Sequence, residues 1–324
     1  MKALVCKEFG SLDALTVEDV PAPVAGPGQV VIDVTAASVN FPDALLVQGK
    51  YQVKPALPFI PGAELSGTIA AVGDGVEKAR IGTPVLAVSG RGAFAEQVVV
   101  KADAALPLDA AIDVATAAAL PMTYGTAYHA LLDRAQLQPG ETLLVLGAGG
   151  GVGLAAVELG KILGATVIAA ASSQEKLDAA SSRGATHLIN YSTEDLRARL
   201  KELTGDRGVD VVCDPVGGSN AEPALRATGW RGRYLVIGFA AGDIPRMPLN
   251  LTLLKGSAIV GVFWGEFMRR EPQRGATELA QLVEWLRDGR LRPLITGRYP
   301  LEDAGAALAA VYERKVTGKL LITI

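Results

Sequence analysis

The sequence predicts an α/β fold with two domains, one built around a doubly wound parallel sheet and the other rich in short β-strands. Its 324 residues are more than one ordinary hydrophobic core accommodates. From about residue 141 onwards, strand-like and helix-like segments alternate, which is typical of a parallel sheet covered by helices on both faces. Before about residue 120, short strand-like runs are separated by Pro and Gly, which favours a compact β-barrel-like domain.

The β-rich part starts with a strand-like run at residues 1–9, whose apolar stretch is too short for a signal peptide. In the next run every second residue is apolar, namely Val30, Ile32 and Val34, as in a strand. Further strands are expected at residues 65–72, 84–88 and 96–100. Residues 115–132 have a helical composition that is interrupted near Pro121.

The alternating part begins with a strand at residues 142–146, a Gly-rich turn and a helix that ends near Leu163, before Gly164. A second helix is expected at residues 174–183, and others between several of the later strands. These later strands are expected at residues 166–170, 187–189, 209–214, 233–237 and 257–262. After about residue 266 the sequence predicts an amphipathic helix at 276–288, a strand at 295–299, a helix at 301–315 and a strand at 319–324.

The composition excludes several classes of function. With 20% charged residues and a formal net charge of −3, nucleic acid and anionic membrane surfaces are not expected as main partners. No apolar run reaches the ~18 residues of a membrane-spanning helix. The two cysteines, Cys6 and Cys213, indicate a reducing, cytoplasmic setting without disulfides. Together with His129 and His187 they show no ligand spacing, so no structural zinc site is expected.

The most informative segment is LLVLGAGGGVGLAAVELGK at residues 143–161. A strand leads into a turn with almost no side chains, and the N-terminus of a helix follows, so that free N–H groups and the helix dipole favour a pyrophosphate. Gly147, Gly150 and Gly153 have the spacing of a dinucleotide-binding turn, and Gly151 and Val152 contribute amides of the first helical turn. The common pattern has a glycine one residue later than Gly147, where this chain has Ala148.

The end of the second strand favours NADPH over NADH. An NAD site usually has Asp or Glu about 20 residues beyond the glycine turn, where it holds the ribose hydroxyls. This chain has Ala170, Ala171 and Ser172 there. Ser172 is a hydrogen-bond donor for a 2′-phosphate and Lys176 a positive charge, although Glu175 lies between them in the sequence.

Several separated segments, in the right order, resemble the medium-chain dehydrogenase/reductase superfamily, and within it the zinc-independent quinone oxidoreductase branch that includes zeta-crystallin. Besides the glycine turn, these segments are MKALVCKEFG, ASVNFPDALLVQGKY, PFIPGAELSGTIAAVG, ALPMTYGTAYHAL, GVDVVCDPVGG and TGKLLITI. The resemblance covers nearly the whole chain. It implies a Rossmann NADPH-binding domain, residues 120–266, inserted into a GroES-like catalytic domain made of residues 1–119 and 267–324. It also implies a homodimer or a dimer of dimers, often joined through the last Rossmann strand.

The sequence departs from the zinc-dependent relatives at the metal ligands. Those enzymes carry Gly-His-Glu where this chain has Gly62, Ala63 and Glu64, and a cysteine near the position of Asn40. Catalytic zinc is therefore not expected. Without zinc to stabilise an alkoxide, alcohol oxidation is disfavoured. Hydride addition to a quinone or enone is easier, because the negative charge delocalises onto an oxygen that hydrogen-bond donors stabilise.

The resemblance also implies the site residues. Asn40 and Tyr51 match cleft positions and are the candidate catalytic residues, Asn40 to orient the substrate or the nicotinamide ribose and Tyr51 to donate to the acceptor oxygen or stack on the ring. The expected cofactor contacts outside the glycine turn are Thr123, Ser172, Lys176, Tyr191, Gly238, Phe239 and Phe263. Each of four candidates also has a purely structural interpretation: Asn40 as a turn residue, Tyr51 as a surface ring, Thr123 as a residue at the start of a helix and Phe263 as a core residue.

Three functions follow from this sequence. The first is an NADPH-dependent quinone reductase with a small-molecule substrate. The second is a reductase of α,β-unsaturated carbonyls or enoyl thioesters, for which Arg269, Arg270 and Arg274 offer positive charge to carrier phosphates. The third is a protein that binds NADPH without turnover, as a sensor or a structural component.

Overall fold

The computed structural model describes all 324 residues, which form two compact units. The β-rich unit consists of Met1–Met122 and Leu279–Ile324, and the Rossmann unit consists of Thr123–Glu278. We expected the domain boundaries at 119/120 and 266/267, and that division remains a proposal for the folding domains. No helix combines the length and the apolar character that crossing a lipid bilayer requires.

The Rossmann unit contains a six-stranded parallel sheet in the order β10-β9-β8-β11-β12-β13. Numbered along the chain this is the order 3-2-1-4-5-6 of a doubly wound dinucleotide-binding sheet, so the predicted fold class is confirmed. β9 and β10 are added on one side of β8, whereas β11, β12 and β13 are added on the other, so the order of the strands reverses between β8 and β11. The strands are β8 (Thr142–Leu146), β9 (Thr166–Ala171), β10 (His187–Asn190), β11 (Val209–Asp214), β12 (Thr228–Val236) and β13 (Ala258–Gly261).

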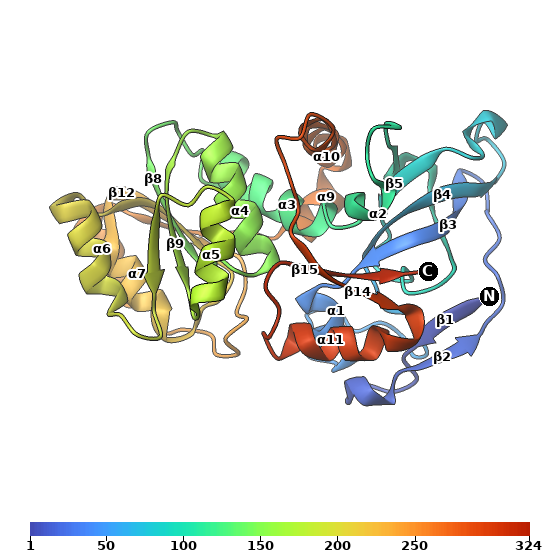
Figure 1. Cartoon of the computed structure of the whole chain (residues 1–324), viewed down its shortest axis with the longest axis horizontal. Helices are drawn as coiled ribbons and strands as arrows, with labels where there is room; N and C mark the ends of the chain where they lie inside the picture. The colour runs from blue at the N-terminus through green and yellow to red at the C-terminus, as the bar shows by residue number, and fades with distance from the viewer. The chain divides into compact units, whose positions relative to one another are not determined.

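Helices cover both faces of this sheet (Figure 1). On one face lie α4 (Gly151–Ile162) and α5 (Gln174–Ser182), and on the other α6 (Leu196–Thr204) and α7 (Ala221–Ala227). Between α6, α7 and the sheet lies an apolar core of buried side chains such as Leu144, Ile168, Leu200, Val212 and Leu225. The strands are almost entirely apolar because both of their faces are buried.

The remaining helices of this unit are short. The expected helix at 115–132 is divided into α2 (Val114–Ala117), which belongs to the β-rich unit, and α3 (Pro121–Tyr128), which begins at the interrupting proline. A π-helical stretch (His129–Arg134) extends α3. α8 (Asn250–Lys255) and α9 (Trp264–Arg270) precede and follow β13. The sequence did not predict α9, since its apolar side chains are too few to show a helical period.

The β-rich unit is built on a seven-stranded sheet that unites both ends of the chain. Its order is β14-β15-β3-β4-β5-β7, and β6 also pairs with β3. The C-terminal strand β15 pairs antiparallel with β3, as expected if both chain ends form one domain. The strands are β3 (Gln29–Ser38), β4 (Glu64–Val72), β5 (Pro84–Val88), β6 (Gln97–Lys101), β7 (Ala105–Pro107), β14 (Ile295–Pro300) and β15 (Lys319–Thr323).

Outside this sheet, β1 (Lys2–Val5) and β2 (Thr16–Asp19) form a two-stranded ribbon. Figure 1 shows α11 (Ala304–Tyr312) beside α1 (Phe41–Val47). The predicted helix at 276–288 is longer than expected and becomes α10 (Pro272–Arg287), which crosses the division between the units. Short 3₁₀ turns complete the structure at Leu12–Ala14, Lys78–Arg80, Ala102–Ala104, Gly205–Arg207, Gly218–Asn220 and Leu301–Asp303.

The sequence did not predict α1, because Pro42 follows Asn40 and Phe41 and suggests a turn. In the structure Pro42 lies in the first turn of the helix, where its missing N–H has no intrahelical partner to lose. Asn40 is the residue that precedes the helix, and its N–H donates to the Asp43 Oδ2 atom at 2.9 Å. The proline therefore marks the start of a helix.

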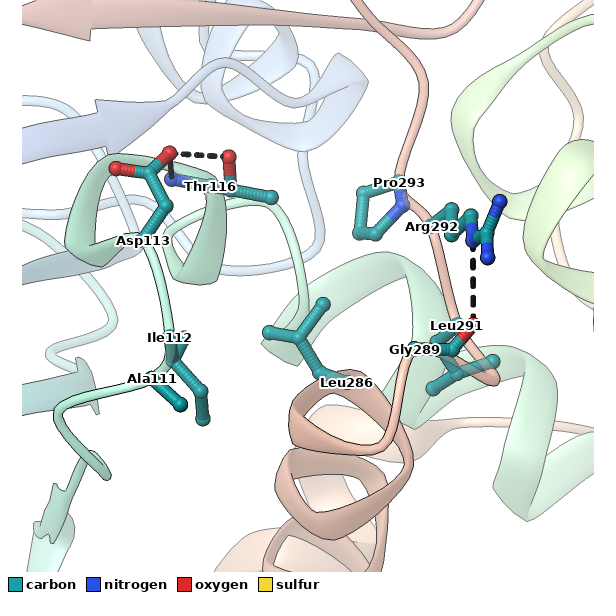
Figure 2. A pocket seen from close by; sticks show the side chains of 9 residues that line it. All are labelled: Ala111, Ile112, Asp113, Thr116, Leu286, Gly289, Leu291, Arg292 and Pro293. Carbon is teal, nitrogen blue, oxygen red and sulfur yellow. Dashed lines mark hydrogen bonds between the residues drawn. The ribbon is translucent and has the colours of Figure 1, made fainter.

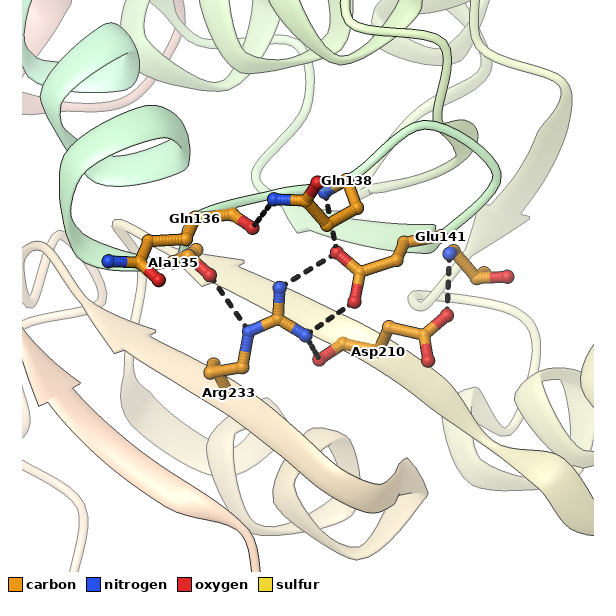
Figure 3. Close-up of polar contacts among 7 residues, drawn as sticks. Ala135, Gln136, Gln138, Glu141, Asp210 and Arg233 are labelled. Carbon is orange, nitrogen blue, oxygen red and sulfur yellow. Dashed lines mark hydrogen bonds and ion pairs between the residues drawn. The ribbon is translucent and has the colours of Figure 1, made fainter.

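A polar network ties three strands together at the amino-terminal edge of the Rossmann sheet (Figure 3). The Arg233 guanidinium donates to both carboxylate oxygens of Glu141 at 2.7 Å and, through Nε, to the Ala135 carbonyl at 2.9 Å. The neighbouring Asp210 carboxylate accepts from the Thr142 N–H at 2.7 Å. This edge lies opposite the glycine turn, so the network supports the end of the sheet that is remote from the turn.

We expect Arg233→Leu to lower the free energy of unfolding of the Rossmann unit by about 2–3 kcal/mol, since Glu141 and the Ala135 carbonyl would lose a charged donor. Tryptophan fluorescence during urea unfolding measures this, because Trp230 and Trp264 lie in this unit. The matched control is Arg270→Leu, whose exposed pair with Glu266 should contribute little to stability. Equal losses in the two variants would contradict the structural role of Arg233.

Candidate functional site

The glycine turn connects β8 to α4 at the point where the sheet order reverses. Gly147 has a φ of +60°, and the Gly150 N–H donates to its carbonyl at 3.0 Å, which closes the turn. The Ala148 N–H donates to Ala170 of the neighbouring strand at 3.0 Å. α4 then starts at Gly151, where the first N–H groups of a helix have no intrahelical acceptor. Ligands in doubly wound sheets bind at this position.

The glycines of the turn differ in what a side chain would meet. A Cβ atom on Gly153 would lie 2.2 Å from the Gly147 carbonyl oxygen, so Gly153 allows the helix to pack on the turn. A Cβ atom on Gly149 would lie 2.4 Å from the Cβ of Lys176. On Gly150 the nearest atom would be the Gly147 oxygen at 3.5 Å, an ordinary contact. Gly150 therefore leaves open space in front of the helix N-terminus.

The loop after β11 packs against the glycine turn. A Cβ atom on Gly147 would lie 2.5 Å from a methyl group of Val216. The buried Asp214 carboxylate holds this loop, because its Oδ1 atom accepts from the N–H groups of Val216 and Gly217, both at 2.8 Å. Its other oxygen accepts from the hydroxyl of the buried Tyr234. Asp214 thus shapes the turn that contains Gly217 and Gly218.

The end of the second strand has the features expected for a 2′-phosphate. Ser172 is exposed directly after β9, and its carbonyl accepts from the Ser192 hydroxyl at 3.0 Å. The Ser173 side chain caps α5 by accepting from the Lys176 N–H at 3.4 Å. The half-buried Tyr191 lies alongside, with its N–H donating to Ala171 at 3.1 Å. No acidic side chain ends this strand.

The remaining candidate cofactor residues also lie in the Rossmann unit. Gly238 and Phe239 follow β12, and the Phe239 ring would be 3.0 Å from a Cβ atom on Gly217. Phe263 is 52% exposed and precedes α9. Thr123 is buried in α3, whose Gly125 packs against Trp264. Thus the structure brings the loops after β8, β11 and β12 together, while contact of each residue with a cofactor remains a proposal.

In the β-rich unit, Asn40 belongs to a buried polar cluster. Its side-chain nitrogen donates to Glu64 Oε1 at 2.8 Å, and its side-chain oxygen accepts from the Lys319 ammonium at 2.6 Å. Glu64 Oε2 accepts from the Met122 N–H at 2.7 Å. Asp43, Glu64 and Lys319 are all at most 5% exposed. Sequence analysis missed Lys319 and Asp43; the only signal was a lysine at the start of an otherwise apolar strand.

Burial dominates the electrostatics of this cluster. It raises the pKa of Asp43 to about 7, a rise to which the charge of Glu64 contributes and which the Asn40 N–H and Lys319 oppose. Burial lowers the pKa of Lys319, and the nearby carboxylates counteract this. Half-buried Tyr51 lies within reach of the Asp43 charge. Burial, and then Asp43, raise the pKa of Tyr51, so its hydroxyl keeps its proton at neutral pH.

The arginine cluster carries little uncompensated charge. Arg269 and Arg270 both pair with Glu266 at 2.6 Å. Arg274 pairs with Asp133 at 2.6 Å and with Glu271 at 2.5 Å. These exposed pairs rearrange at little cost, so the structure shows a neutralised surface and no preformed anion site.

The β-rich unit also has a pocket of about 290 Å³ beside the end of α10 (Figure 2). Its lining is largely apolar, with Ile112, Leu286 and Leu291 among the side chains. The two charged residues are engaged elsewhere. The Asp113 carboxylate caps α2 by accepting from Thr116, and the Arg292 Nε donates to the Gly289 carbonyl at 3.2 Å. Ligand sites usually offer convergent polar groups, which this pocket lacks.

Comparisons with known proteins agree with this geometry. Two family models match, "Alcohol dehydrogenase GroES-like domain" at residues 26–110 and "Zinc-binding dehydrogenase" at residues 151–285. Quinone oxidoreductase-like protein 2 of Mus musculus is 37% identical over 324 residues, which cover 100% of this chain and 92% of that protein.

Solved structures are similar over the whole chain. The Escherichia coli quinone oxidoreductase complexed with NADPH has a TM-score of 0.92 at 28% identity, with 100% of both chains covered. A structure described as an NAD-dependent alcohol dehydrogenase has a TM-score of 0.91 at 29% identity, again with 100% of both chains covered. The complex of this fold with NADPH supports NADPH as the cofactor, whereas similarity of fold alone does not select the substrate.

We expect Gly150→Ala to weaken dinucleotide binding and Gly153→Ala to lower the stability of the fold. The first should fold normally and bind dinucleotide at least about tenfold more weakly, because its methyl group would occupy the space in front of the helix. The second should lower the free energy of unfolding by about 1–3 kcal/mol, because its methyl group collides with the Gly147 carbonyl. Isothermal titration with NADPH and urea unfolding separate the two effects. Unchanged NADPH affinity in Gly150→Ala would contradict a pyrophosphate site at this turn.

Asp43→Asn should change how stability depends on pH. The folded protein holds the Asp43 proton up to about pH 7, whereas an unfolded aspartate loses it near pH 4. The stabilising contribution of this group is therefore complete below about pH 4 and is lost as the pH rises to about 7. Relative to Asp43→Asn, the wild type should lose stability between pH 5 and 7 and show a constant difference above pH 8. Urea midpoints of both proteins across this range provide the measurement, and a constant difference throughout would contradict the raised pKa.

Proposed function

Because the chain belongs to the medium-chain dehydrogenase/reductase superfamily, in its quinone oxidoreductase branch, we propose that it is an NADPH-dependent, zinc-independent quinone reductase. The coarser conclusion, an oxidoreductase that uses NADPH, has the support of the quinone oxidoreductase relatives and of the NADPH complex with this fold. The quinone as substrate, Asn40 and Tyr51 as catalytic residues, and the homodimer are our own proposals.

The observation that carries the cofactor assignment is the pairing of the glycine turn with the end of β9. The turn provides open space and helix N–H groups for the pyrophosphate. Beside it, the first carbons of the Lys176 side chain lie against Gly149, and Ser172 directly follows the end of β9. A 2′-phosphate at the end of β9 would have the Lys176 cation and serine hydroxyl groups as neighbours. No acidic residue stands at the end of β9, where its charge would repel the phosphate.

Bound NADPH supplies the hydride from the nicotinamide ring. The protein has to orient the acceptor and stabilise the negative charge that develops on its oxygen. Tyr51 suits the second task, because its hydroxyl stays protonated at neutral pH and donates a hydrogen bond. Asn40 suits the first, because a buried side chain with fixed partners holds one geometry. The proton that completes the reduction comes from solvent or from a hydroxyl group of the site.

The residues present do not fit a catalytic zinc ion. Zinc is usually bound by Cys, His and carboxylate side chains. In this cluster Ala63 has no donor atom, Asn40 offers only an amide oxygen, and a Lys319 ammonium already occupies the side of Glu64 that faces Asn40. A cation beside that ammonium would be repelled. We therefore derive no catalytic step through a metal.

The other two functions have less support. Reduction of enals or enones remains compatible with the same hydride chemistry. An enoyl thioester enzyme needs free positive charge for its carrier phosphates, and Arg269, Arg270 and Arg274 are paired with carboxylates. A protein that binds NADPH without turnover does not require the buried Asn40 cluster.

A homodimer through the edge strand β13 is the proposed assembly. β13 pairs with β12 on one side only. Near it, Trp230, Leu253 and Leu254 are 73%, 81% and 69% exposed, and the Trp230 ring lies over Gly256. Unpaired strand edges and exposed apolar patches are costly for an isolated chain and usually mark an interface.

The experiment for the proposed function is NADPH oxidation by the purified protein in the presence of a chelator. We expect 1,4-benzoquinone to be reduced with a higher kcat/KM than an alkenal or an enoyl-CoA. Turnover of enoyl-CoA alone would favour the second function, and no turnover with any acceptor would contradict an enzymatic role. Activity that the chelator removes would contradict zinc independence.

Lys176→Glu tests the choice of cofactor. Since it places a negative charge beside the expected 2′-phosphate, it should weaken NADPH binding by roughly 100-fold and NADH binding by much less. The matched control is Lys161→Glu, a charge reversal at the far end of α4. Isothermal titration with both dinucleotides measures the ratio, and an unchanged ratio in Lys176→Glu would refute the NADPH assignment.

Leu253→Glu together with Leu254→Glu should shift the protein from dimer to monomer, because two charges would have to be buried at the proposed interface. Light scattering of the eluting protein measures the mass. The control is Ile81→Glu, at an exposed apolar position of the β-rich unit. A wild type that is monomeric at micromolar concentration would rule out the proposed assembly.

A further inference from the structure

A buried ammonium group lies at the centre of the polar cluster in the β-rich unit. Lys319 is the first residue of β15 and is 5% exposed. Its three donors meet three acceptors: the Asn40 side-chain oxygen at 2.6 Å, the Val39 carbonyl at 3.0 Å and Glu64 Oε1 at 3.4 Å. Lysine is rarely buried to this extent, since its charge is costly to remove from water unless it is paired and hydrogen-bonded.

The partners of the Asn40 carboxamide allow only one orientation. Its nitrogen donates to Glu64 Oε1 at 2.8 Å and to the Ser38 carbonyl at 3.3 Å, and its oxygen accepts from Lys319. Rotating the amide by 180° would point its N–H groups at the ammonium and its oxygen at the carboxylate. Both contacts would be repulsive, so the two charges select the orientation.

Glu64 is itself held in place. Its second oxygen accepts from the Met122 N–H at 2.7 Å, at the start of α3. Asp43 completes the cluster from α1 by accepting from the Asn40 N–H, and its Oδ1 atom is buried without a hydrogen-bond partner. Asn40 is thus fixed by its backbone on one side and by opposite charges on the other.

We propose that Lys319 is a positioning residue that fixes the Asn40 carboxamide in a single orientation for the reaction. The proposal rests on the role proposed above for Asn40. Both side-chain N–H groups of Asn40 donate to acceptors inside the protein. Its oxygen accepts from Lys319 and has one lone pair left to accept a further hydrogen bond. Asn40 therefore presents an acceptor to a hydroxyl group of the bound molecules, and Tyr51 is left as the donor to the acceptor oxygen.

Two variants separate this positioning role from simple charge balance. Lys319→Met removes the donor and leaves Glu64 as an uncompensated buried carboxylate, so it lowers both stability and activity. Lys319→Met combined with Glu64→Gln removes both charges; the single oxygen of the glutamine keeps the acceptor for the Asn40 nitrogen and loses the one for the Met122 N–H. The double variant should therefore recover part of the stability while kcat/KM with 1,4-benzoquinone stays roughly 10- to 100-fold below that of the wild type.

A double-mutant cycle with Asn40→Ala tests whether Lys319 acts through Asn40. If it does, Asn40→Ala and Lys319→Met each lower kcat/KM, and their combination is no worse than the more damaging single variant. Three outcomes would overturn the proposal. In the first, the losses in kcat/KM of Asn40→Ala and Lys319→Met multiply in the combined variant. In the others, Lys319→Met keeps wild-type activity, or the Lys319→Met, Glu64→Gln variant regains activity together with stability. Full activity of Asn40→Ala would remove its basis as well.

Hydrogen exchange of the Asn40 side-chain amide can be measured without turnover. It therefore tests the positioning role of Lys319 separately from the proposed function. The chain has four asparagines, Asn40, Asn190, Asn220 and Asn250, and Asn40 is the buried one. Protein labelled with ¹⁵N-asparagine therefore gives few side-chain amide signals, and Asn40→Ala assigns the one of interest. We expect a protected Asn40 pair in the wild type whose hydrogen exchange is at least about tenfold faster in the Lys319→Met, Glu64→Gln variant. An unchanged pair would overturn the positioning role, whatever acceptor the enzyme reduces.

Discussion

The close approach of Gly153 to the Gly147 carbonyl is the constraint on which the candidate cofactor site depends. It lets α4 start directly behind β8, so that the first N–H groups of the helix face the turn. Val216 then packs against Gly147 from the next strand, and Lys176 against Gly149 from α5. Three neighbouring segments are thus positioned by contacts that exist only because these residues lack side chains. The site is largely formed by backbone packing before any ligand binds.

Charge is distributed in two different ways in the two units. In the Rossmann unit the strong pairs lie at the amino-terminal edge of the sheet, as in the contact between Arg233 and Glu141. The carboxyl-terminal edge consists mainly of glycines, amides and hydroxyl groups, with Lys176 and the buried Asp214 as charged side chains, which suits a dinucleotide. In the β-rich unit the charges of Glu64 and Lys319 are buried together, and they orient a neutral amide. Buried charges of this kind are better explained by specificity of geometry than by stability.

Much of the fold could be predicted because strand periodicity and glycine spacing are local signals. The strands at Thr142–Leu146 and Val209–Asp214 have the expected bounds, as continuous apolar runs between turn residues should. β12 starts five residues earlier than expected, at Thr228 rather than Arg233, because a shift in register accommodates Gly229 and Gly232. Lys319 could not be identified as part of the Asn40 cluster, since their contact joins residues 279 positions apart. Only the pairing of β15 with β3 brings them together.

That pairing also determines when the cluster can form during synthesis. The Rossmann unit is one continuous segment, so all of its strands are synthesised before residues 279–324. The β-rich unit has to wait for β15, which follows the whole Rossmann unit in the sequence. Until then Glu64 and Asn40 lack their cation, and the end of β3 at residues 36–38 has an unpaired edge to which another nascent chain can add. The order of translation therefore exposes the unit that carries the proposed catalytic residues to mispairing for longer than the unit that binds the cofactor.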